Sequence, residues 1–96
     1  MDVLVAYDIG TITPEGERRL ARVAAICERY GTRVQYSVFE CRLDSAGLER
    51  LKGELADTLV VGEDAVDIYR FDRSIEEVRT SLGRARTFRS GGSWIF

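Results

Sequence analysis

The stretch from Arg33 to Leu43, RVQYSVFECRL, limits what this chain can fold into more than any other. Apolar residues alternate along it as in a strand, but the alternation changes phase. One face would carry Val34, Tyr36 and Val38, and the other Phe39, Cys41 and Leu43. A single strand with one buried face cannot do this, because its side chains alternate with a period of two. We therefore predict two short strands, with a kink, a bulge or a tight reversal near Tyr36 and Ser37.

Helical patterns flank this pair of strands. The first begins after Thr13, a typical N-cap residue followed by Pro14, and ends near Gly31. The second follows Asp44 or Ser45, either of which could cap it. The apolar stripes are Leu20, Val23, Ala24, Cys27 and Tyr30 in the first helix, and Leu48, Leu51 and Leu55 in the second. Both helices are therefore predicted to lie on a sheet.

Two further strand patterns enclose this region, an apolar run from Val3 to Ile9 and the sequence DAVDIYRF from Asp64 to Phe71. The resulting order, βαββαβ, is that of the ferredoxin-like α+β fold, a four-stranded antiparallel sheet with two helices on one face. We assign residues 1–71 to this core. Several strands carry apolar residues on both sides, so the second sheet face is expected to meet another copy in a homodimer.

Residues 72–96 form a C-terminal extension, expected to contact the dimer partner or another protein. Ser74 and Glu77 match a capping box ahead of a helix that would run past Leu82 to a stop at Gly83. The apolar end from Trp94 to Phe96 is expected to add an edge strand to a sheet, in this subunit or a neighbour.

Composition narrows the possible chemistry. The chain has no histidine, which excludes histidine acid–base catalysis, Ser-His and Cys-His pairs, and histidine metal sites. Its apolar runs are far shorter than a membrane span and no leader pattern opens it, so we expect no membrane and a cytoplasmic location. Thirteen of the fourteen basic residues are arginine, which suits phosphate binding, although a GC-rich genome would produce the same bias.

Asp8 is a carboxylate at the end of an apolar strand, where it needs a partner or solvent. It could stabilise the following turn by bonding the backbone at Gly10 or Thr11, or it could bind a ligand. Asp2, Asp64 and Asp67 also lie in strand patterns, but the sequence does not place them beside Asp8.

Three segments carry a resemblance to a known family. The strand VLVAYDI ending in Asp8, the stretch YGTRVQYSVFEC from Tyr30 to Cys41, and the later DAVDIYRF occur in that order. Together they closely resemble the CRISPR-associated protein two family, the smaller of the two CRISPR adaptation proteins, over residues 1–71. The resemblance implies a ferredoxin-like homodimer that acts as a metal-dependent endonuclease on RNA or double-stranded DNA. It also implies a place, beside the CRISPR-associated integrase, in the complex that inserts new spacers.

The same resemblance suggests site residues. Asp8 would be the metal ligand, with one Mg²⁺ or Mn²⁺ shared between the two Asp8 side chains of the dimer. The residues implicated in activity would be Asp8, Tyr7, Arg33 and Phe39. Candidates for nucleic-acid binding are Arg18, Arg19, Arg22 and Arg33, with Arg84, Arg86 and Arg89 from the acid-free tail.

Simpler roles are open for several of these residues. Phe39 could be only a core or interface ring, and Arg33 only a solvated charge at a strand edge. Arg18, Arg22 and Arg29 share one face of the first helix, as a ridge for phosphate or as an ordinary solvated face. Two other functions are also open: a non-catalytic DNA-binding scaffold for the integrase, and a toxin-like ribonuclease of similar fold.

Overall fold

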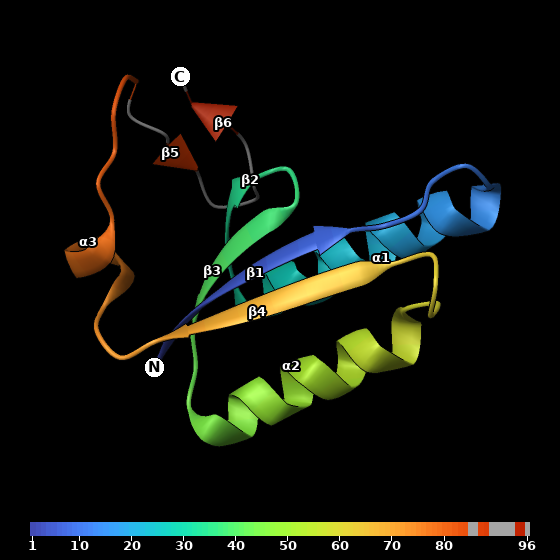
Figure 1. Ribbon diagram of the computed structural model, residues 1–96, viewed down its shortest axis with the longest axis horizontal. Coiled ribbons are helices and arrows are strands. Elements are labelled where there is room, and N and C mark those ends of the chain that lie inside the picture. The colour runs from blue at the N-terminus through green and yellow to red at the C-terminus, as the bar shows by residue number, and fades with distance from the viewer. Residues whose placement is uncertain (85–86, 89–93, 96) are drawn as a thin grey trace.

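The predicted βαββαβ order is confirmed by the computed structural model, which describes residues 1–84, 87–88 and 94–95. Its core elements are β1 (Asp2–Asp8), α1 (Pro14–Tyr30), β2 (Gly31–Gln35), β3 (Val38–Arg42), α2 (Ser45–Thr58) and β4 (Ala65–Phe71). The four strands form one antiparallel sheet in the order β2-β3-β1-β4 (Figure 1). The fold is therefore the ferredoxin-like α+β arrangement.

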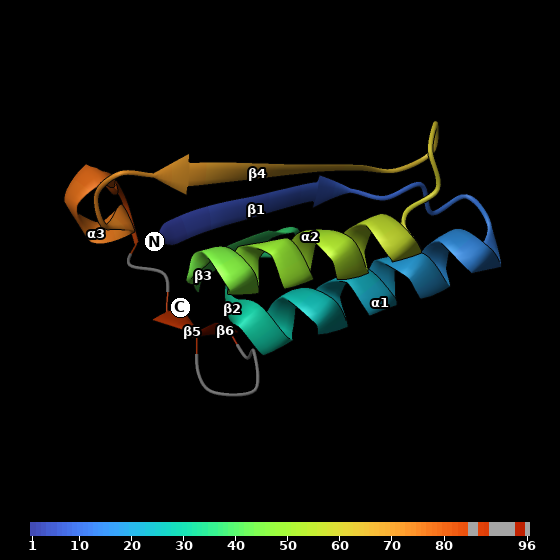
Figure 2. The ribbon, with the colours of Figure 1, turned by 90° about the horizontal axis from the view of Figure 1, so that it is seen from below.

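Both long helices lie on one face of the sheet (Figure 2). The core between the layers includes Val3, Val5 and Tyr7 of β1, Phe39 and Cys41 of β3, Val23, Ile26 and Cys27 of α1, and Leu48, Leu51 and Leu55 of α2. Leu20 was predicted to belong to this core, but its side chain is 37% exposed. Ile26, which the predicted stripe left out, is buried in its place. Neither α1 nor α2 covers the opposite sheet face, which carries Leu4, Ala6 and Asp8 of β1 by alternation.

The predicted reversal between the two middle strands is confirmed. Tyr36 and Ser37 form the turn between β2 and β3, and the pairing register shifts between Arg33 and Gln35. Arg33 pairs with Phe39, so both side chains lie on the sheet face that α1 covers. The reversal therefore brings an arginine from an edge strand over the core.

Local capping signals set where the long helices begin. The Thr13 hydroxyl accepts a hydrogen bond from the Gly16 N–H at 3.1 Å, and the Asp44 carboxylate accepts one from Gly47 at 2.7 Å. At Gly16 a Cβ atom would lie 1.9 Å from the carbonyl oxygen of Gly10, so only glycine fits there. The loop after β1 therefore packs directly on the first turn of α1.

The extension differs from its prediction in two ways. The helix α3 (Ile75–Val78) ends before Leu82, because Val78 and Leu82 are exposed and only Ile75 gains a buried site. The strands β5 (Thr87–Phe88) and β6 (Trp94–Ile95) pair with each other in a separate two-stranded sheet. They add no edge strand to the four-stranded sheet, and Phe96 lies outside the described residues.

In the ranges that the structure describes, no helix is both long and apolar enough to cross a bilayer.

Candidate active site

Asp8 stands at the end of β1 as an exposed carboxylate. Its backbone pairs with Ala65 of β4, and alternation along β1 places its side chain on the sheet face that α1 and α2 leave uncovered. Among the described residues, its carboxylate has no hydrogen bond or ion pair. The turn-stabilising alternative is therefore not observed, and the carboxylate is available to a ligand.

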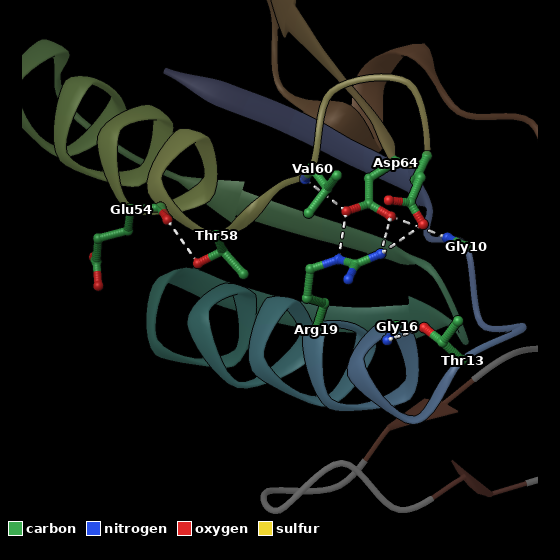
Figure 3. Close-up of polar contacts among 9 residues, drawn as sticks. Gly10, Thr13, Gly16, Arg19, Glu54, Thr58, Val60 and Asp64 are labelled. Atoms are coloured by element: carbon green, nitrogen blue, oxygen red, sulfur yellow. Dashed lines mark hydrogen bonds and ion pairs between the residues drawn. The ribbon is translucent and has the colours of Figure 1, made fainter.

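Asp64 stabilises the turn after β1, which is one of the roles that the sequence suggested for Asp8. Its carboxylate accepts hydrogen bonds from the backbone N–H groups of Gly10, at 3.0 Å, and Val60, at 2.8 Å. The Arg19 guanidinium reaches it from α1, with its Nε 2.7 Å from Oδ2 (Figure 3). We call Asp64 and Arg19 the clamp. It ties together the loop after β1, helix α1 and the loop before β4.

The clamp is buried and charged. The Asp64 side chain has no exposed surface and that of Arg19 is 14% exposed. The Arg19 guanidinium, with help from the two backbone N–H groups, lowers the pKa of Asp64 to about 2. Arg19 was predicted to bind nucleic acid, but in this structure its guanidinium is occupied by Asp64. Its placement indicates a structural role.

Tyr7, Phe39 and Arg33 form a stack between the sheet and α1. The Tyr7 and Phe39 rings are stacked with centroids 6.2 Å apart, and the Arg33 guanidinium lies 5.1 Å from the Phe39 centroid. Phe39 has no exposed surface, so it offers none to a substrate. It is a core ring, and any part it has in activity is through its support of Tyr7 and Arg33.

Tyr7 is also nearly buried. Its hydroxyl donates a hydrogen bond to the Tyr36 carbonyl oxygen at 3.1 Å, which ties β1 to the β2–β3 turn. Burial raises the pKa of Tyr7, and the nearby Arg33 guanidinium offsets part of that rise. The phenol therefore keeps its proton at neutral pH.

Arg33 is the member of the stack whose side chain has a hydrogen-bond donor without a partner in the described residues. One terminal nitrogen lies 3.7 Å from the Glu28 carboxylate, and 21% of the side chain is exposed. Its Nε is buried without a hydrogen-bond partner in the described part of the chain. The alternative role as a solvated charge at a strand edge is therefore wrong, because most of the side chain is buried.

A groove brings three of the four predicted catalytic residues together. It has a volume of about 460 Å³, and Tyr7, Asp8 and Arg33 all line it. Glu17 of α1 and Tyr36 of the β2–β3 turn line it as well. No signal in the sequence pointed to these two, because α1 and the β2–β3 turn meet the end of β1 only in the folded chain.

Of the other candidate arginines, those in the described part of the chain do not line this groove. Arg18 pairs with Glu15 at 3.4 Å on the surface of α1, and Arg22 and Arg84 are exposed. Arg29, the third member of the predicted ridge, donates a hydrogen bond to Glu54 of α2. Arg86 and Arg89 lie outside the described residues. Nucleic-acid binding by Arg18, Arg22 and the tail stays a prediction.

A single chain offers a divalent cation few ligands. Residues 1–84, with the four further residues described, hold no group of three His, Cys, Asp or Glu side chains able to bind a metal ion. Asp2 is bound to Arg42 and the Ile75 N–H at the other end of β1, and Asp64 is in the clamp. Asp67 pairs with Ala6, which lies two residues before Asp8 on β1, so Asp67 is on the same sheet face as Asp8. Asp8 offers the carboxylate oxygen that Mg²⁺ and Mn²⁺ prefer as a ligand.

Comparisons with known proteins identify the family that this chain resembles. The family described as CRISPR associated protein Cas2 matches residues 1–77. The CRISPR-associated endoribonuclease Cas2 of Chlorobaculum tepidum is 46% identical over 69 residues, 72% of each chain. The CRISPR-associated endonuclease Cas2 of Halalkalibacterium halodurans is 47% identical over 83 residues, 86% of each chain.

A solved structure shows the same arrangement. The crystal structure of Streptococcus pyogenes Cas2 at pH 6.5 superimposes with a TM-score of 0.77 at 38% identity. The match covers 86% of this chain and 100% of that one. By sequence and by fold, this chain belongs to the Cas2 family of CRISPR-associated proteins.

Proposed function

We propose that this protein is a metal-dependent endonuclease that hydrolyses phosphodiester bonds in RNA or double-stranded DNA, with Asp8 as its metal ligand. The observation that carries the proposal is the exposed Asp8 carboxylate, which has no partner among the described residues. The names of the relatives from Chlorobaculum tepidum and Halalkalibacterium halodurans, an endoribonuclease and an endonuclease, support the reaction class.

The proposed site is completed by a homodimer. Within the described residues, the end of β1 supplies one carboxylate without a partner, that of Asp8, whereas Mg²⁺ and Mn²⁺ favour several oxygen ligands. The uncovered sheet face carries half-buried Leu4, Ala6 and Val38, with Tyr69 52% exposed. Packing this face against a second copy would bury apolar surface and direct both Asp8 side chains toward the two-fold axis. The two carboxylates would then hold one ion.

The division of labour follows from the side chains. A bound Mg²⁺ or Mn²⁺ supplies charge neutralisation at the phosphate and lowers the pKa of a coordinated water. Asp8 would bind the ion, and Arg33 would contact the nucleic acid through its guanidinium. Tyr7 would keep the β2–β3 turn beside Asp8 through its hydrogen bond to the Tyr36 carbonyl oxygen. Phe39 would support Arg33 from below.

Membership of the family supports a second role in the same setting. The dimer would bind DNA for the CRISPR-associated integrase during spacer acquisition. Arg18 and Arg22 are exposed on α1 and Arg84 on the extension, where they would contact phosphates. This role needs no cleavage, so it holds independently of Asp8.

Replacing Asp8 with asparagine should reduce Mg²⁺- or Mn²⁺-dependent cleavage of RNA and duplex DNA about a hundredfold, because the site loses its charged ligand. Cleavage products would be measured on gels with labelled substrates, with EDTA as the metal-free arm. Asp57→Asn is the matched control, since Asp57 is an exposed carboxylate on α2 that does not line the groove beside Asp8. Equal cleavage by a folded Asp8→Asn protein would overturn the proposed mechanism.

A further inference from the structure

The end of β1 is held in place by a side chain where the backbone pairing stops. Asp8 is the last residue of the strand, and it pairs with Ala65 at the start of β4. One step further along, the Asp64 carboxylate takes over and accepts the N–H of Gly10 at 3.0 Å (Figure 3). Strand ends open more readily than strand interiors. The residue with the free carboxylate is therefore the one whose position depends most on this contact.

Gly10, two residues after Asp8, is also enclosed by backbone from two other segments. A Cβ atom at Gly16 would lie 1.9 Å from the Gly10 carbonyl oxygen, which shows how closely the first turn of α1 approaches. A Cβ atom at Gly10 would lie 3.0 Å from the carbonyl oxygen of Glu63, in the loop before β4. With its N–H bound by Asp64, Gly10 cannot shift unless one of these segments shifts too.

Arg19 keeps the Asp64 carboxylate in this position. Its guanidinium binds both carboxylate oxygens, with Nε 2.7 Å from Oδ2 and a terminal nitrogen 3.2 Å from Oδ1 (Figure 3). The Asp64 side chain has no exposed surface, so without Arg19 it would be a buried charge with no counter-charge. Bringing water to that carboxylate would require it to move. Because it also binds the N–H groups of Gly10 and Val60, the backbone after β1 would move with it.

We propose that Arg19 and Asp64 are positioning residues for the metal ligand, so that the affinity of the protein for a divalent cation depends on the clamp. The inference rests on the proposed function, in which the two Asp8 carboxylates of a dimer share one ion. Mg²⁺ tolerates little departure from ideal ligand geometry, and a displaced strand end would occur in both subunits. In this role neither clamp residue touches the ion. Both act through the backbone of Gly10 and Ala65, which flank the paired end of β1.

The test measures Mn²⁺ binding to the full-length protein without nucleic acid, from the electron paramagnetic resonance signal of the free ion. Arg19→Met should weaken Mn²⁺ binding by roughly tenfold, as is common when a residue that orients a metal ligand is lost. Arg19→Lys keeps a positive charge beside Asp64 and should recover most of the affinity. Because no nucleic acid is present, a contact between Arg19 and phosphate cannot contribute to the result. Unchanged Mn²⁺ binding by Arg19→Met would overturn the proposal.

The matched control is a second ion pair on the same strand. Arg42 binds Asp2 at the opposite end of β1, with its Nε 3.0 Å from Oδ1. Arg42→Met should leave Mn²⁺ binding within about twofold, at a temperature where circular dichroism shows all the proteins to be folded. Equal weakening by Arg42→Met and Arg19→Met would assign the effect to general destabilisation and overturn the proposal. Loss of the dimer by Arg19→Met in sedimentation would overturn it as well, because assembly would then explain the lost affinity.

Cleavage assays separate this inference from the proposed function. Arg19→Met should need roughly tenfold more Mn²⁺ for half-maximal cleavage and approach the wild-type rate at saturating Mn²⁺. A lower maximal rate with an unchanged Mn²⁺ requirement would contradict a positioning role. Asp8→Asn should lose Mn²⁺ binding altogether. Normal Mn²⁺ binding by Asp8→Asn would overturn the proposed function and this inference with it, whereas normal binding by Arg19→Met alone would overturn only the inference.

Discussion

Replacing Asp64 with alanine should lower the melting temperature by roughly 10 °C or more, the largest stability loss expected from any single carboxylate here. The variant leaves the Arg19 guanidinium, only 14% exposed, without its counter-charge. It also removes the acceptor from the N–H groups of Gly10 and Val60. Because these groups belong to three segments of the chain, the loss should loosen the loop that follows Asp8. Circular dichroism during heating at neutral pH would measure the shift.

The control for the clamp is an exposed carboxylate. Asp72→Ala should change the melting temperature little, because Asp72 lies on the surface after β4. Arg19→Met combined with Asp64→Ala should destabilise by less than the sum of the single changes, since each removes the same interaction. A fully additive double variant would contradict the clamp.

The pH dependence of the same variant gives a second readout. The pKa of Asp64 is about 2 in the folded protein, against 3.8 for an unpaired aspartate. Because the pKa of Asp64 is lower in the folded protein than in the unfolded chain, its ionised form stabilises the fold. This stabilisation is complete above pH 3.8 and is lost as the pH falls toward 2. The melting-temperature gap between wild type and Asp64→Ala should therefore narrow across that window.

Replacing Phe39 with alanine should destabilise the fold by about 3–5 kcal/mol, through lost burial and the cavity left behind. The ring is completely buried, stacks on Tyr7 and lies under the Arg33 guanidinium. Urea unfolding monitored by circular dichroism would measure the change. The free energy should fall with little change in the slope, since the folded and unfolded states keep their exposed areas.

A milder substitution separates packing from direct participation. Phe39→Leu keeps most of the buried volume, so it should cost much less stability and retain cleavage. Loss of cleavage by Phe39→Leu at unchanged stability would show that the ring acts on the substrate directly. That outcome would contradict its assignment as a core residue.

Local patterns predicted most of the elements because their signals act over a few residues. Thr13 and Asp44 accept the backbone N–H three residues on, so the helix starts could be read from the chain. The phase change near Tyr36 predicted the β2–β3 reversal for the same reason. The prediction for α3 was wrong beyond Val78, because a capping box can begin a helix but cannot supply a surface for Leu82 to pack on.

The candidate site was predictable only in part. Asp8 stood out because a carboxylate ending an apolar strand needs an explanation, and its exposed position agrees with that expectation. The pairing of Arg19 with Asp64 could not be predicted, because the two residues lie 45 positions apart in the sequence. The burial of Phe39 and Tyr7 could not be predicted either, because it depends on packing between the sheet and α1.

The sequence by itself determined the order of the elements, the strand reversal and the carboxylate that ends β1, since these depend on neighbours along the chain. Only the tertiary structure decided which aspartate holds the turn and which faces solvent. The same holds for Arg33, whose Nε is buried beside the groove that Asp8 also lines. The physical reason is that burial and charge pairing depend on contacts between segments far apart in sequence, and no local pattern records them.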